Sequence, residues 1–120
     1  DLASSFPSIE EFAEGQVITR KHLQWFHSNY VPHPDDMSNP YASPLLAEDH
    51  TGLPSAVIVT AGFDPLRDEA QAYANKLKKA GVFTQHKEYS SLGHGFIVAD
   101  ATAAVRKANK EICEMLEDLL

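Results

Sequence analysis

A run of five residues, Ala56-Val57-Ile58-Val59-Thr60, constrains the fold of this chain more than any other feature of its sequence. The run carries no charge, does not alternate between apolar and polar residues, and is rich in β-branched side chains. Such a run is typical of a strand that is buried on both faces. Strands of this kind belong to parallel sheets covered by helices on both sides, so the sequence predicts an α/β fold.

The segments that follow this run support the same prediction. The apolar spacing and Gly81 predict a helix from about Leu66 to Ala80, and residues 84–89 form a second, less apolar strand. Asp100 is expected to cap a last helix with a buried apolar stripe, made of Val105, Ala108, Ile112, Met115, Leu116 and Leu119. Strand, helix, strand and helix in this order predict parallel strands. Two parallel strands do not make a stable sheet, so we expect residues 56–60 to pair with a further strand from outside this chain.

Residues 1–40 follow a different pattern, with short helices and a proline-rich loop. Ser8 and Glu11 predict a capping box for a first helix, and Thr19 predicts the N-cap of a second. We therefore divide the chain into cap or linker helices with a loop over residues 1–40 and an α/β unit over residues 41–120.

Composition excludes several classes of function. The net charge of −7 argues against nucleic-acid binding, because the surface repels phosphate backbones. The apolar runs are too short for a membrane span. Cys113 is the single cysteine of the sequence, so it cannot form an internal disulfide, and it is expected to be buried as packing. A single cysteine favours a reducing compartment, and we expect a cytoplasmic protein.

Two loops that leave the carboxyl ends of the predicted strands carry the chemistry. One loop contains Asp64 and the other contains His94, and adjacent parallel strands bring such loops together. A carboxylate bonded to one imidazole nitrogen fixes the tautomer and leaves the other nitrogen free to accept a proton from a nucleophile. We therefore predict that an oxygen of Asp64 lies within about 3.2 Å of His94 Nδ1.

Each of these residues also has a plain structural interpretation. Asp64 before Pro65 is typical of a helix N-cap followed by proline at the first helical position. His94 between two glycines is equally typical of a surface turn. Asp68 and Glu69 in the first helical turn interact favourably with the helix dipole, which is reason enough for their presence.

Several motifs taken together resemble a known family, the hormone-sensitive-lipase-like esterases, also called family IV of the α/β-hydrolase superfamily. They are Tyr41-Ala42-Ser43-Pro44-Leu45, Gly52-Leu53-Pro54, Asp64-Pro65-Leu66-Arg67-Asp68-Glu69 and His94-Gly95-Phe96, in this order. The resemblance is strong over about residues 40–96. It implies that Asp64, not Asp68, is the acid of a Ser-Asp-His triad and that His94 is the general base.

The sequence also departs from that family. No G-x-S-x-G serine elbow precedes Asp64, although the serine comes first in the chain order of these enzymes, and no His-Gly-Gly-Gly oxyanion loop is present. We therefore expect this chain to be the C-terminal part of the enzyme, partnered by an N-terminal part that supplies both. Trp25, Phe26 and Tyr30 are then expected to line the acyl pocket, although an aromatic helix face is more often plain core.

The resemblance implies hydrolysis of a small-molecule carboxylic ester through an acyl-enzyme, with no metal or organic cofactor. The chain alone should be inactive because it lacks the serine. One alternative is a non-catalytic receptor on the same fold, like the plant gibberellin receptors, which have lost the catalytic histidine. Another is amide chemistry by an amidase, deacetylase or serine peptidase, because specificity is set by the pocket and not by the fold.

Overall fold

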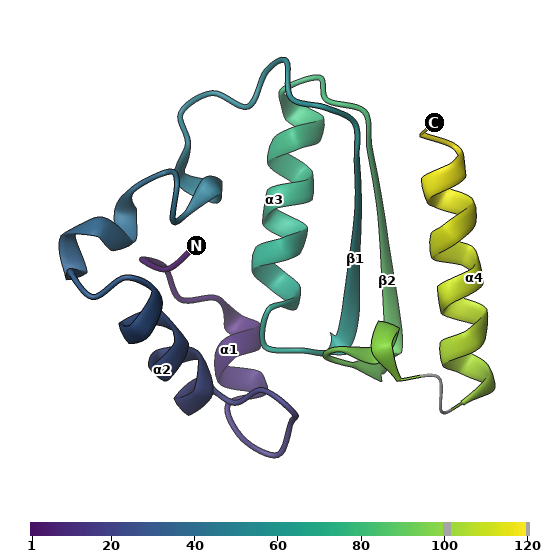
Figure 1. The fold of residues 1–120 in the computed structure, drawn as a ribbon, viewed down its shortest axis with the longest axis horizontal. Coiled ribbons are helices and arrows are strands. Elements are labelled where there is room, and N and C mark those ends of the chain that lie inside the picture. The colour runs from purple at the N-terminus through teal and green to yellow at the C-terminus, as the bar shows by residue number, and fades with distance from the viewer. Residues whose placement is uncertain (100–101, 120) are drawn as a thin grey trace.

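The computed structural model describes residues 1–99 and 102–119, and its centre is a pair of parallel strands between two helices. The strands are β1 (Ala56–Phe63) and β2 (Thr84–Gly93). Helix α3 (Arg67–Lys79) covers one face of the pair and α4 (Ala103–Glu117) covers the other (Figure 1). The α/β class and the order strand, helix, strand, helix are therefore confirmed.

Both strands are longer than predicted, and their extra residues determine where the loops begin. The parallel register runs from Ala56 opposite Thr84 to Ala61 opposite Tyr89, and then shifts before Phe63 pairs with Gly93. Asp64 and His94 thus each come directly after the last residue of a strand. Because the strands are parallel, both residues lie at the same edge of the sheet.

The outer edge of β1 is without a partner in the part of the chain that the structure describes. Within the described residues, the sheet consists of β1 and β2. Residues 56–59 are half-buried, and full burial begins at Thr60. Of the run that was predicted to be covered on both faces, residues 56–60, only Thr60 is thus buried within this chain.

The core on the α4 side joins the sheet to the segment after His94. Ala61, Phe96, Val105 and Ala108 form a buried cluster there. The predicted cap of the last helix, Asp100, lies outside the described residues, and the N-cap of α4 is Thr102. No helix within residues 1–99 and 102–119 combines the length and the apolar character that crossing a membrane requires.

Two predictions for the C-terminal helix were wrong. Cys113 is exposed, not buried, and Leu116 exposes 47% of its surface although it was placed in the buried stripe. The part of the stripe that the sheet covers is the N-terminal half of α4, where Val105 and Ala108 are buried.

The N-terminal segment lies on the α3 side of the sheet (Figure 1) and contains α1 (Pro7–Glu11) and α2 (Arg20–Tyr30). The predicted cap Thr19 is confirmed, because its side chain accepts a hydrogen bond from His22 N in a complete capping box. The predicted capping box of Ser8 and Glu11 is wrong: α1 already begins at Pro7, its N-cap is Phe6, and Ser8 is fully buried. The division at residue 40 stays a prediction.

Short 3-10 turns, η1 (Pro34–Ser38) and η2 (Pro44–Leu46), connect the N-terminal segment to β1. The motif at residues 41–45 has a structural role in this loop. His50 Nε2 donates to the carbonyl oxygen of Pro44 at 3.0 Å, and Lys76 Nζ of α3 donates to that of Leu45 at 2.7 Å. Ser43 is fully buried. These contacts hold the loop against α3.

Candidate active site

The turn after β1 fixes the carboxylate of Asp64. Its Oδ1 accepts a hydrogen bond from Leu66 N at 2.8 Å, and its carbonyl oxygen accepts one from Arg67 N at 3.1 Å. The N-cap of α3 is Leu66, so Asp64 is not a helix cap as its plain structural interpretation required. Pro65 is fully buried in this turn. One carboxylate oxygen is thus used to hold the turn, and the other is left for the site.

His94 occupies a turn that two neighbouring residues stabilise. Gly95 has a φ of 75°, a left-handed conformation that glycine adopts without steric cost. Phe96 is buried, and its ring packs against Tyr89 with centroids 5.2 Å apart. The turn therefore projects His94 from the sheet while Phe96 anchors it in the core.

Asp64 and His94 are in direct contact. Asp64 Oδ2 lies 2.9 Å from His94 Nδ1, which confirms the predicted distance. The side chain of Asp64 exposes 12% of its surface and that of His94 exposes 31%. Because an ionised carboxylate can only accept, Nδ1 donates, and Nε2 of the neutral ring carries the lone pair. This arrangement leaves Nε2 free to accept a proton.

Asp68, the other aspartate of the motif, has different partners. Its Oδ2 accepts from Ser8 N at 2.9 Å and its Oδ1 accepts from Arg67 Nε at 2.9 Å. Of the two aspartates, Asp64 alone is bonded to His94. The geometry thus agrees with the choice of Asp64 that the resemblance implied.

A small cavity of about 210 Å³ opens beside the pair. It is lined by Val59, Ala61, Asp64, His94, Gly95, Phe96 and Ile97. None of these described lining residues carries a hydroxyl, thiol or amine, so a serine-type nucleophile is not among them. Within residues 1–99 and 102–119, no group of three or more His, Cys, Asp or Glu side chains could hold a metal ion.

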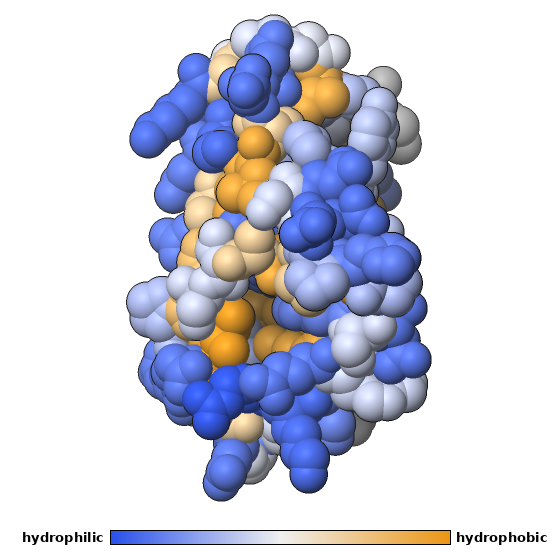
Figure 2. All heavy atoms as spheres, turned by 90° about the vertical axis from the view of Figure 1, so that its left-hand side faces the viewer, coloured by the Kyte–Doolittle hydropathy of each residue, from blue (hydrophilic) through white to orange (hydrophobic). Residues whose placement is uncertain are grey.

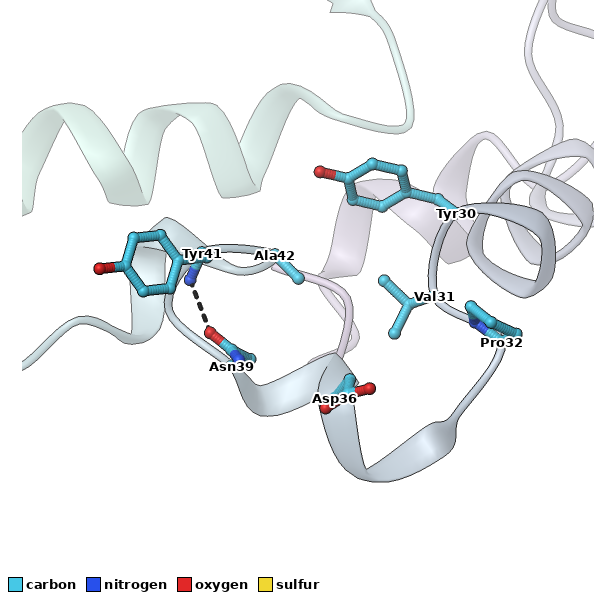
Figure 3. A pocket seen from close by; sticks show the side chains of 7 residues that line it. All are labelled: Tyr30, Val31, Pro32, Asp36, Asn39, Tyr41 and Ala42. Atoms are coloured by element: carbon cyan, nitrogen blue, oxygen red, sulfur yellow. Dashed lines mark hydrogen bonds between the residues drawn. The ribbon is translucent and has the colours of Figure 1, made fainter.

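The three predicted substrate-binding residues lie apart from this cavity. Trp25, Phe26 and Tyr30 are on α2 and expose 62%, 46% and 69% of their surface, which contradicts the interpretation of this face as plain core. Tyr30 lines a different hollow of about 300 Å³ between α2 and the loop around η1 (Figure 3). Figure 2 looks onto this side and shows apolar patches among polar side chains. An acyl-pocket role for the three stays a prediction.

Gly62 shapes the site in a way that sequence reasoning did not recognise. A Cβ atom at Gly62 would lie 2.1 Å from the carbonyl oxygen of Ser90 on β2. The register shift between Ala61 and Phe63 falls at the same place. A glycine inside a strand is a known sign of a bulge or of close backbone approach, and that sign was available in the sequence. Gly62 therefore lets the two strand ends converge before Asp64.

Comparisons with known proteins agree with this geometry. A family model described as the alpha/beta hydrolase fold matches residues 1–98. The carboxylic ester hydrolase LipN of Mycobacterium tuberculosis is 42% identical over 81% of this chain and 26% of its own length. The arylesterase of Saccharolobus solfataricus is 39% identical over 99% of this chain and 38% of its own.

A solved structure is similar over almost the whole chain. The ester hydrolase EH1AB1 from the metagenome of Lake Arreo has a TM-score of 0.86 and 41% identity, over 96% of this chain and 37% of that one. The chain thus spans 26% and 38% of the two curated relatives above. It belongs to the alpha/beta hydrolase fold family, among the hormone-sensitive-lipase-like esterases that its motifs resemble.

Proposed function

We propose that this chain supplies the acid and the base of a Ser-Asp-His triad in a carboxylic ester hydrolase. The observation that carries the proposal is the 2.9 Å contact between Asp64 Oδ2 and His94 Nδ1 at the ends of adjacent parallel strands. The relatives named above are ester hydrolases, which supports the same reaction for the complete protein.

The reaction proceeds in two halves. His94 Nε2 removes the proton from a serine hydroxyl as its oxygen attacks the ester carbonyl, and then gives that proton to the leaving alcohol as the acyl-enzyme forms. In the second half His94 takes a proton from water, which attacks the acyl-enzyme, and returns it to the serine as the carboxylic acid leaves. Asp64 holds the ring in the required tautomer and stabilises its positive charge.

The serine is provided, in this proposal, by a preceding part of the same enzyme. The order serine, acid, histidine along the chain in this fold puts the serine elbow before Asp64. None of the described residues that line the cavity carries a hydroxyl or a thiol. The outer edge of β1, unpaired within residues 1–99 and 102–119, offers backbone groups to the strand that carries this elbow.

Two other functions are compatible with this fold. A non-catalytic receptor fits the site less well, and amide hydrolysis fits it equally well. The retained pair of Asp64 and His94 favours catalysis over a non-catalytic receptor, because a receptor has no use for an aligned acid and base. Amide hydrolysis uses the same triad, and a panel of aryl esters, aryl amides and small peptides separates it from ester hydrolysis. A small-molecule ester substrate and a cytoplasmic location stay predictions.

Substitutions in the complete enzyme test the roles. With an activated short-chain aryl ester, Asp64→Asn should lower kcat by on the order of 10⁴ and His94→Ala by on the order of 10⁶. Asp35→Asn and His33→Ala, an exposed aspartate and histidine in the loop around η1, are matched controls and should leave kcat unchanged. Full activity in Asp64→Asn would exclude the proposed triad.

The isolated chain tests the missing nucleophile. Without a serine elbow the purified 120-residue chain should hydrolyse no activated ester, and its open β1 edge should make it aggregate or unfold over a broad range of denaturant. Addition of the preceding part of the enzyme should restore turnover. Turnover by the pure chain that disappears in His94→Ala would show that this chain contains its own nucleophile.

A further inference from the structure

The buried hydroxyl of Ser8 binds the turn that carries Asp64. Ser8 lies in the first turn of α1 with no exposed surface. Its Oγ donates a hydrogen bond to the carbonyl oxygen of Pro65 at 2.7 Å and accepts one from Asp68 N at 3.2 Å. The N-terminal segment is thereby bonded to the residue that directly follows Asp64.

The connection is reciprocal. Ser8 N donates to Asp68 Oδ2 at 2.9 Å, while Asp68 N donates to Ser8 Oγ. Each of the two residues therefore satisfies a free N–H in the first turn of the other's helix, as an N-cap side chain does within one helix. Helices α1 and α3 are locked together at their N-terminal ends.

Arg67 adds a second connection between the same two segments. Its Nη2 donates to Glu11 Oε2 at 2.8 Å, and its Nη1 donates to the carbonyl oxygen of Gly62 at 3.1 Å. The guanidinium also lies 5.3 Å from the ring centre of Phe12. Its hydrogen bonds with Asp68 and then with Glu11 raise the pKa of Arg67 above its ordinary value. Arg67 thus spans the turn after β1 and is itself bonded to the N-terminal segment.

One peptide group links Ser8 to the carboxylate. The carbonyl oxygen of Pro65, which accepts from Ser8, and the N–H of Leu66, which donates to Asp64 Oδ1, belong to the same peptide unit. Because that unit is planar and rigid, its orientation determines where Oδ1 must lie. The position of Oδ1 in turn orients Oδ2, the oxygen 2.9 Å from His94 Nδ1.

We infer that Ser8 is a positioning residue for Asp64. It holds the peptide between Pro65 and Leu66 so that the second carboxylate oxygen stays within reach of His94. The inference rests on the proposed function, because it assigns Ser8 a role in the same triad. It also gives the N-terminal segment a part in the chemistry, in addition to any role in substrate binding.

The test is Ser8→Ala in the complete enzyme. We expect kcat to fall roughly tenfold, as for a small misplacement of a catalytic group, with KM unchanged. The acidic limb of the pH–rate profile should move to lower pH, because a displaced carboxylate stabilises the protonated ring less. Ser28→Ala is the matched control, since it removes a similar hydroxyl-to-carbonyl bond, from Ser28 Oγ to Trp25 O at 2.9 Å, within α2.

A double substitution separates positioning from general stability. If Ser8 acts through Asp64, Ser8→Ala should lower kcat no further in the Asp64→Asn background. An equal loss in both backgrounds, or an unshifted pH profile in Ser8→Ala, would overturn the inference. If Ser8→Ala does not fold, Ser8→Cys keeps a weaker donor of similar size and should give a smaller shift in the same direction. Full activity in Asp64→Asn would instead contradict the proposed function itself.

Discussion

The site edge of the sheet and the outer surface of α2 are built in contrasting ways. At the site edge, both Asp64 oxygens and His94 Nδ1 have partners within the chain, and the side chains are mostly buried. On α2, Trp25 and Tyr30 expose more than half of their surface, and Leu23 is the buried residue of the helix. The difference teaches that this chain itself arranges the contact between Asp64 and His94, whereas it leaves the aromatic side chains of α2 largely uncovered.

Among the substitutions that test this contrast, Gly62→Ala is expected to change stability and kcat the most. The new Cβ would lie 2.1 Å from the backbone oxygen of Ser90, so the strand ends must separate and carry Asp64 away from His94. We expect a destabilisation of about 3 kcal/mol and a loss of kcat of roughly a hundredfold in the complete enzyme. Chemical denaturation and ester kinetics measure the two effects.

Gly93→Ala is the matched control for this substitution. A Cβ at Gly93 would meet its nearest neighbour, the carbonyl oxygen of Phe63, at an ordinary distance of 3.6 Å. The two glycines lie in the last two residues of neighbouring strands, but only Gly62 is tightly enclosed. Equal losses in the two variants would show that the close approach at Gly62 is not what arranges the pair.

A smaller effect is expected on the α2 side. Trp25→Ala should raise KM for esters with longer acyl chains by roughly tenfold, as loss of one aromatic contact does, and leave kcat for an acetyl ester nearly unchanged. Val17→Ala, another exposed apolar residue outside α2, is the control and should change neither constant. Kinetics over a series of acyl lengths measures the effect. An equal increase in KM for esters of every acyl length would place Trp25 outside the acyl pocket.

The smallest effect concerns His86 on β2, whose ring is hydrogen-bonded to Thr60 Oγ1 at 3.1 Å. Burial, with a further contribution from Lys78, lowers the pKa of His86 from its ordinary value of 6.5. The unfolded chain therefore binds more protons than the folded one, and the free energy of unfolding should fall as the pH drops below 6.5. His86→Gln should reduce this slope in urea unfolding, whereas His33→Gln, at an exposed position, should not. An unchanged slope in His86→Gln would contradict the prediction.

Local patterns in the sequence were sufficient for the strand order and for the contact between Asp64 and His94. Hydrophobic runs and turn residues act over a few positions, and parallel strands then place both loops at one edge. The role of Ser8 could not be predicted in this way, because its partners Pro65 and Asp68 are distant in sequence. Its apparent capping box with Glu11 suggested instead a role within its own helix. Burial of Cys113 was predicted wrongly because helical periodicity identifies a face but not what covers it.

The segment from Phe63 to Gly95 contains Asp64, His94 and helix α3 in one continuous piece of chain. In evolutionary terms this segment could be exchanged between related hydrolases as a unit, while the recipient protein keeps its own α2 surface. The exchange has conditions, since Pro65 is bonded to Ser8 and Arg67 to Glu11, both far outside the segment. A transplanted segment would retain its alignment only where the recipient protein supplies these partners, so the two pieces are expected to diverge together.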